Sequence, residues 1–157
     1  DFNGNIFDEN NQPTGDQLTL YVEDAKVGDA AQITSYFEAE YKVGMFNFDL
    51  GYRFVDGLYA DYSINNSDFL QPDNDGALKL PSYGLVNLGT TARFDLFGNN
   101  ASFRVNVNNL LNNIYIMESN SNIHATDASD TWNGVDTTNF VWFGFGTTWN
   151  ATFRWNF

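Results

Sequence analysis

The oxygen-bearing side chains best spaced to bind a metal ion stand at the start of the sequence. They recur at intervals like those of a calcium-binding loop, in which carboxylate and amide oxygens surround the ion. Such a loop needs glycine at its sixth position and glutamate at its twelfth, but this chain has Ile6 and Gln12 there. The stretch therefore favours an Asn/Gly-rich turn, and we predict no metal site. The residues concerned are Asp1, Asn3, Asn5 and Glu9.

Side chains that could carry out catalysis are scarce. His124 is the only histidine and the chain has no cysteine, so a paired-histidine metal site, a thiolate nucleophile and a disulfide framework are all excluded. The sequence contains no nucleophile elbow, no phosphate-binding loop and no Gly-x-Gly-x-x-Gly. We predict no enzymatic activity, no catalytic residue and no cofactor.

A second group of side chains fits the binding of a polar solute. It combines aromatic rings, which could stack on a sugar or peptide, with amides, carboxylates and the histidine, which could hydrogen-bond to it. Most of these residues lie in one long connection; for Tyr115, a place in an interfacial aromatic belt is the alternative. The candidate ligand-binding residues are Tyr115, Asn120, Asn122, His124, Asp127, Asp130 and Trp132.

The composition excludes some partners and favours others. Twenty Asp and Glu against seven Lys and Arg give a formal net charge of -13, which disfavours nucleic acid, because phosphates are bound by basic side chains. Aromatic residues make up 17% of the chain and charged residues only 17%, where about 25% charged is usual. No apolar run is long enough for a membrane-spanning helix, but the strands of a membrane barrel give no such run either.

Five segments alternate between apolar and polar residues, which is typical of strands with one apolar face. No segment has a convincing helical pattern. The last segment places apolar residues at most of its odd positions and polar ones at the even positions near its end. The segments are residues 31–43, 45–59, 83–96, 101–111 and 140–157.

The connections between these segments alternate in length. Gly44 alone separates the first two strands, and residues 97–100 form a second short turn. Residues 1–30, 60–82 and 112–139 are long connections. Short turns at one end and long loops at the other are typical of outer-membrane barrels, whose loops face outward. The predicted organisation is thus a hairpin over 31–59, a hairpin over 83–111, a closing strand over 140–157 and three outer loops.

Charged side chains segregate within the strands. Nine of the ten share the polar face, and the exception, Asp56, stands near a loop end. Lipid would enforce this pattern, because a cation facing mid-membrane costs about 2–4 kcal/mol; the core of a soluble sandwich would enforce it too. We expect the nine to face a barrel lumen, in salt-bridged ladders across the wall or onto a plug. They are Glu38, Glu40, Lys42, Asp49, Arg53, Arg93, Asp95, Arg104 and Arg154.

The carboxy terminus ends on aromatic residues at alternate positions. This ending resembles the signal that outer-membrane barrels present to their insertion machinery. The residues that carry it are Trp149, Phe153, Trp155 and Phe157.

Residues 80–116, "LPSYGLVNLGTTARFDLFGNNASFRVNVNNLLNNIYI", resemble the end of a TonB-dependent outer-membrane receptor. They combine a Pro-Ser-Tyr entry to a strand with an Asn-Leu-Leu-Asn-x-x-Tyr motif. The family usually has Asn-Leu-Phe-Asp-x-x-Tyr, so Leu111 and Asn112 depart from its pattern. "AKVGDAAQITSYFEAEYKV" and "FGFGTTWNATFRWNF" are similar to members from bacteria that feed on polymers through surface lipoproteins.

The resemblance implies an all-β fold: five antiparallel transmembrane strands at the carboxy-terminal end of a 22-stranded barrel in the outer membrane of a Gram-negative bacterium. The implied partners are the lipid bilayer, the remaining strands, a plug that contacts the TonB-type energy transducer, and a surface lipoprotein lid. The plug is absent from this sequence, and Asp1 looks internal to a longer precursor.

The implied function is energy-dependent uptake of a scarce solute such as a glycan, a peptide or an iron chelate. Two alternatives stay open on the residues alone. A passive porin-like barrel would share the strands and the terminal phenylalanine. A soluble β-sandwich that binds carbohydrate would share the alternation.

Overall fold

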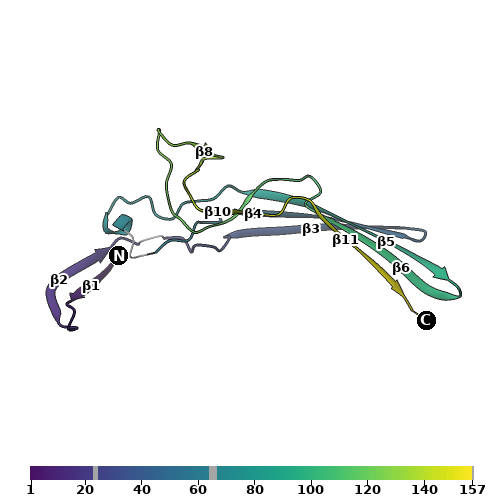
Figure 1. Ribbon diagram of the computed structural model, residues 1–157, viewed down its shortest axis with the longest axis horizontal. Coiled ribbons are helices and arrows are strands. Elements are labelled where there is room, and N and C mark those ends of the chain that lie inside the picture. Colours follow the sequence, from purple (N-terminus) through teal and green to yellow (C-terminus); the bar gives the residue numbers. More distant parts are fainter. Residues whose placement is uncertain (23–24, 64–66, 157) are drawn as a thin grey trace. The chain divides into compact units, whose positions relative to one another are not determined.

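The computed structural model describes residues 1–22, 25–63 and 67–156 and is all-β apart from one 3₁₀ helix, η1 (Ser67–Leu70). The chain forms two compact units, each described separately below (Figure 1). The loop unit comprises Asp1–Ala30, Leu58–Leu80 and Glu118–Trp142. The sheet unit comprises Ala31–Gly57, Pro81–Met117 and Phe143–Phe157.

The sheet unit is built on one antiparallel sheet of five strands in the order β11-β6-β5-β4-β3. Four strands are neighbours in sequence, and the last strand of the chain pairs with β6. The sheet is open, with β3 and β11 at its edges. Its strands are β3 (Ile33–Val43), β4 (Phe46–Asp56), β5 (Tyr83–Leu96), β6 (Asn99–Asn108) and β11 (Thr148–Trp155).

The alternating segments of the sequence coincide with these five strands, and the antiparallel pairing confirms the coarse all-β expectation. Several boundaries differ: β3 begins at Ile33 rather than at residue 31 and β4 at Phe46 rather than at residue 45. β4 ends at Asp56 rather than at residue 59, and β6 begins at Asn99 and ends at Asn108. Both ends are set by left-handed backbone: Gly57 has φ 62° and Asn109 has φ 49°, and neither conformation continues a strand.

The expected closing strand over 140–157 is interrupted, which corrects the prediction. β10 (Val141–Phe143) pairs with β7 (Ile116–Ser119), whereas β11 pairs with β6. Between them, Gly144 and Gly146 bring the backbone against the side chains of Tyr115 and Asn112. Glycine permits this close approach because it has no Cβ.

The pairing register places like side chains opposite each other across the whole sheet. One row on the apolar face runs through Val43, Phe46, Ala92, Phe103 and Phe153. Residues directly opposite in an antiparallel pair point to the same face. All nine charged side chains expected on the polar face therefore share that face.

Glycines within the sheet lie under side chains of neighbouring strands. A Cβ on Gly51 would meet the ring of Tyr36, and one on Gly84 would meet the ring of Tyr52. At Gly89 the added atom would meet the Asp49 carboxylate and the Arg104 guanidinium. Such packing covers the backbone where a strand glycine would leave it bare.

The loop unit corrects the prediction that 1–30 and 112–139 lack strands. β1 (Phe2–Phe7) and β2 (Pro13–Leu20) form a hairpin whose turn is closed by the Asp8 carboxylate, which accepts hydrogen bonds from the amides of Asn10 and Gln12 at 2.9 and 2.8 Å. β8 (Thr131–Trp132) and β9 (Val135–Asp136) form a second, shorter hairpin. Local turn chemistry makes these hairpins, which are too short or irregular to give a clear alternating signal.

The loop unit has a small core of its own. Leu58, Ala60, Phe69, Leu80 and Val135 are buried. Backbone hydrogen bonds join the two segments that contribute to this core. The Leu80 amide donates to the Leu58 carbonyl at 2.8 Å, and the Ala60 amide donates to the Leu78 carbonyl at 2.9 Å. The predicted outer loop over 60–82 is therefore tied down at its end.

We predict that Gly89→Ala destabilises the sheet by roughly 1–3 kcal/mol, the usual cost of forcing an extra methyl into a packed site. The added methyl must displace Asp49 or Arg104. Chemical denaturation of the variant alone and in an Asp49→Ala background measures the effect. The loss should largely vanish in the double variant; full additivity would contradict the explanation.

Candidate functional site

The apolar face of the five-stranded sheet is largely uncovered. Phe37 is 68% exposed, Tyr41 66%, Trp149 72% and Phe153 55%. All four lie in the edge strands β3 and β11, and in the inner strand β4 the apolar-face residues Phe48 and Leu50 are still 37% and 49% exposed. A contiguous apolar surface of this kind marks contact with a partner or a membrane.

The polar face is the better packed of the two. The Arg104 guanidinium makes two parallel hydrogen bonds to the Asp49 carboxylate, at 3.0 and 2.8 Å, and a third to the Thr91 hydroxyl at 3.0 Å. Its Nε donates to Asn106 at 2.7 Å, and Asn106 donates to Asn150 at 2.9 Å. This network runs across four strands and satisfies groups that apolar surroundings would penalise.

A second cluster lies at the β3–β4 end of the same face. Glu40 accepts a hydrogen bond from Asn47 at 2.7 Å and pairs with Lys42 at 3.3 Å. Asn47 is buried, and its Oδ1 has no hydrogen-bond partner among the described residues. A donor on that side would complete the network.

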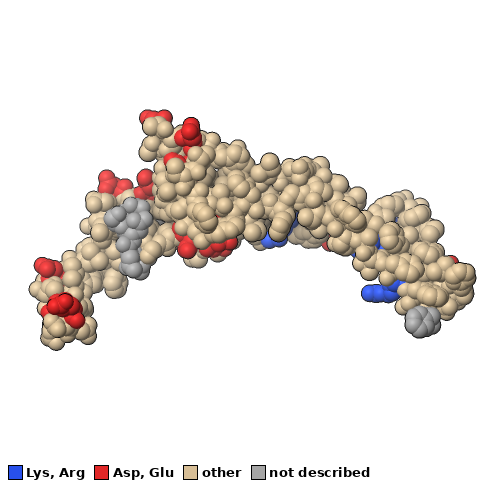
Figure 2. All heavy atoms as spheres, in the orientation of Figure 1, with Lys and Arg blue, Asp and Glu red and all other residues tan. Residues whose placement is uncertain are grey.

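On the face shown, acidic side chains gather over the loop unit (Figure 2). Desolvation raises the pKa of Asp29, and the nearby charges of Asp61 and Glu118 raise it further. In the second hairpin, hydrogen bonds from Ser129 and Thr138 lower the pKa of Asp136. The surface of this unit is thus strongly negative at neutral pH.

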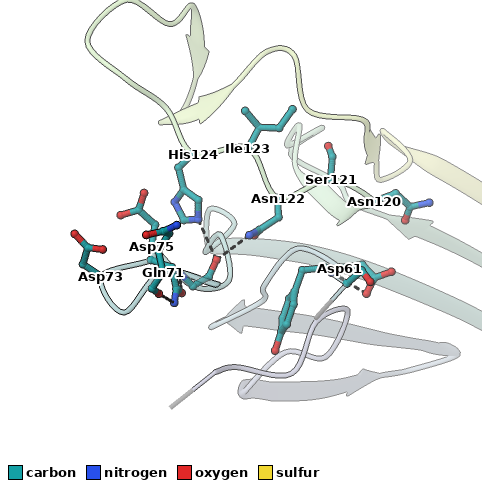
Figure 3. A pocket seen from close by; sticks show the side chains of 13 residues that line it. Asp61, Gln71, Asp73, Asp75, Asn120, Ser121, Asn122, Ile123 and His124 are labelled. Atoms are coloured by element: carbon teal, nitrogen blue, oxygen red, sulfur yellow. Dashed lines mark hydrogen bonds between the residues drawn. The ribbon is translucent and has the colours of Figure 1, made fainter. Parts of the chain in front are cut away.

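The loop unit contains a cleft of about 670 Å³ (Figure 3). That volume lies within the range usual for small-molecule sites. Three segments supply its walls: residues 61–63, 71–76 and 120–124. Carboxylates, amides, a hydroxyl, the Tyr62 ring and Ile123 line it, and no Lys or Arg is among the described lining residues.

Side-chain amides hold the segments around the cleft together. Asn122 accepts a hydrogen bond from the Leu78 amide at 2.6 Å and donates to the Gly76 carbonyl at 2.8 Å. His124 Nε2 lies 3.2 Å from the same carbonyl, which can only accept, so that nitrogen carries the proton. Asn74 bridges the Tyr21 and Gln71 carbonyls. These groups shape the cleft, which leaves Asp61, Asp73 and Asp75 as its charged lining.

The structure brings some of the expected ligand-binding residues together and separates others. Asn120, Asn122 and His124 line the cleft, but Asp127, Asp130 and Trp132 do not. Tyr115 belongs to the sheet unit, where its ring packs against Tyr83 with the ring centroids 4.2 Å apart. The sequence does not predict that Asp61, Tyr62 and Asp73 line the cleft, because they lie in another loop that only the fold brings near residues 120–124.

Most of the first nine residues form strand β1 rather than the predicted Asn/Gly-rich turn. Asn3 and Asn5 lie in the extended strand β1, and Asn3 Oδ1 accepts a hydrogen bond from the Thr19 hydroxyl at 2.7 Å. No cluster of three or more His, Cys, Asp or Glu side chains that could hold a metal ion occurs in the described part of the chain. Among the described residues, no helix is both long and apolar enough to cross a membrane.

The Asn-Leu-Leu-Asn-x-x-Tyr motif forms a cluster of amide hydrogen bonds within the sheet unit. Asn109 is buried; its Nδ2 donates to the Asn113 and Phe145 carbonyls at 2.9 and 3.1 Å, and its Oδ1 accepts from the Asn113 amide at 2.9 Å. Asn112 Oδ1 accepts from the Thr147 amide at 3.0 Å. The motif therefore connects the end of β6 to the segment that leads into β11.

The terminal aromatic residues lie on the last strand. Trp149, Phe153 and Trp155 share the apolar face of β11, opposite Val107, Phe103 and Ala101. Phe157, the final residue of the expected insertion signal, lies outside the described residues.

We predict that Asn109→Ala destabilises the sheet unit by about 2–4 kcal/mol, because it removes buried hydrogen bonds and places alanine at a left-handed position. Asn109→Gly separates the two causes, since glycine tolerates the backbone but cannot hydrogen-bond. Denaturant titration should place the glycine variant between wild type and alanine. Equal stability of all three proteins would contradict a stabilising role for Asn109.

Comparison with known proteins gives no relative from which to transfer a function. No family model, no curated protein and no solved structure matches the chain.

Proposed function

We propose that this chain is the carboxy-terminal wall of a TonB-dependent receptor, embedded in the outer membrane of a Gram-negative bacterium. In this proposal hydrocarbon covers the apolar face of the five-stranded sheet. Further strands of the same polypeptide pair with the edges at β3 and β11, because an open edge in lipid would leave backbone groups unsatisfied. The intact receptor imports a scarce solute when the energy transducer acts on its plug.

The observation that carries the proposal is the inverted exposure of the sheet. Large aromatic side chains such as Phe37 and Trp149 are exposed on the apolar face, whereas polar groups such as Asn47 and Thr91 are buried on the other. A soluble sheet would cover the apolar face. Lipid on one face and a polar interior on the other match this arrangement.

Two further features support the receptor rather than a general barrel. Residues 80–116 resemble TonB-dependent receptors. The hydrogen bonds of Asn109 give the motif that carries this resemblance a structural role. The loop unit also offers a cleft of small-molecule size. A receptor needs such a surface, on which its solute is captured before import.

Adjacent positions on β11 offer a matched test. Ala151 lies on the apolar face and Asn150 on the polar face, and both are exposed. If lipid covers the apolar face, Ala151→Lys should destabilise the membrane-inserted protein by about 2–4 kcal/mol, whereas Asn150→Lys should cost much less. Urea titration of the complete gene product in phosphatidylcholine vesicles measures both.

The outcome that would contradict the membrane assignment is equally specific. In a soluble module that leaves this face in water, both variants should match wild type. In a soluble β-sandwich a second sheet would cover Ala151, so Ala151→Lys would still destabilise the protein and its location decides between sandwich and membrane. The complete gene product would then appear in a detergent-free soluble fraction rather than with the outer membrane.

A second prediction separates a plugged receptor from a passive porin. Liposomes containing the complete gene product should not swell in isotonic arabinose, because a plug blocks the barrel. A general porin in parallel liposomes is the positive control. Swelling at the porin's rate would overturn the receptor assignment while leaving the membrane wall intact.

A further inference from the structure

The turn between β5 and β6 combines a strained backbone with an exposed aromatic ring. Leu96 pairs with Asn99, so only Phe97 and Gly98 form the connection. Their φ angles are 55° and 79°, which places both residues in the left-handed region that a type I′ hairpin turn requires. Asparagine followed by glycine is the preferred sequence for this turn, and here phenylalanine takes the asparagine's place.

Nothing in the turn itself explains that choice. The Gly98 amide donates a hydrogen bond to the Asp95 carboxylate at 2.9 Å, so a side chain other than Phe97 closes the turn. Phe97 is 86% exposed, more than Phe145 at 81% or Trp149 at 72%. In water this residue would carry two free-energy costs: the left-handed backbone of a bulky residue and the exposure of an apolar ring. Strain that persists without a local benefit points to a role outside the turn.

Other exposed apolar side chains lie at the same end of the sheet. The β3–β4 turn contains Met45, which is 45% exposed, and β11 ends near Trp155, which is 41% exposed. The register places this end of β11 beside Ala101 and Phe94, close to the β5–β6 turn (Figure 1). Leu96 is the last apolar-face residue of β5, and the exposed Phe97 follows it directly where the chain reverses.

We propose that Phe97 is seated in the lipid–water interface at the turn end of the sheet and fixes how deeply the sheet sits in the bilayer. This inference rests on the proposed membrane location. The occupant we assign is the headgroup boundary of a phospholipid layer. That boundary is continuous with the lipid on the apolar face, and aromatic rings are enriched at it.

A stability comparison gives opposite signs for an anchor and for an idle ring. Phe97→Asn installs the preferred turn sequence, so an idle ring in water predicts equal or greater stability. An anchor predicts that the variant loses about tenfold in its folding equilibrium constant in phosphatidylcholine vesicles, a typical size for one lost side-chain contact. Phe97→Trp, which keeps an interfacial ring, should stay close to wild type. Urea titration of the complete gene product in vesicles measures all three proteins.

A depth measurement supplies an independent readout. This sequence contains no cysteine, so Phe97→Cys can be labelled with a bimane fluorophore after any cysteine elsewhere in the complete product is replaced. Lipids brominated near the headgroup should quench the label more strongly than lipids brominated near the chain end. Absence of quenching by either lipid would overturn the proposal, as would an unchanged or more stable Phe97→Asn variant. If Ala151→Lys still destabilises the protein, that failure concerns the anchor alone and not the membrane wall.

Discussion

The antiparallel register of the five-stranded sheet is the constraint on which the rest of this structure depends. Because paired residues share a face, one register decides the surroundings of every side chain in β3 to β6 and β11. A shift by one residue on any strand would move its aromatic rings to the polar face and its charges to the apolar face. The observed register does neither, and it separates the two chemistries across all five strands.

The polar face shows how this register is stabilised from within. Asp49 and Arg104 lie on different strands, yet their side chains meet above Gly89, which pairs with Asp49 and lies two residues before Thr91, the partner of Arg104. A larger residue at that position would hold the pair apart. The glycine and the ion pair are therefore one feature, and a sheet without a core on its apolar side gains order from it.

Asparagine does much of the work of holding the irregular parts in place. Asn109 joins the end of β6 to the segment before β11, and Asn122 joins two walls of the cleft. An amide side chain offers a donor and an acceptor together, so one residue satisfies carbonyls and amides that have no strand partner. Amides such as Asn122 hold the walls of the cleft together, and its carboxylates remain as charged lining. A solute that enters it meets acceptors and negative charge.

The sequence alone determined the features that repeat with a period of two. The all-β class, the five strands, the segregation of charge and the short turns all follow from alternation and turn chemistry, which act between near neighbours in the chain. The tertiary structure alone decided which loop residues meet. It brings Asp61 and Tyr62 to residues 120–124, and it packs Tyr115 against Tyr83 rather than into the cleft. It also pairs β10 with β7, where the sequence predicted one strand continuous with β11. Those contacts depend on hydrogen bonds between residues distant in sequence, and no periodic pattern records them. The two-residue strands at 131–136 escaped prediction because they carry too few alternations to be distinguished from loop. The first hairpin escaped because its strands, FNGNIF and PTGDQLTL, do not alternate consistently.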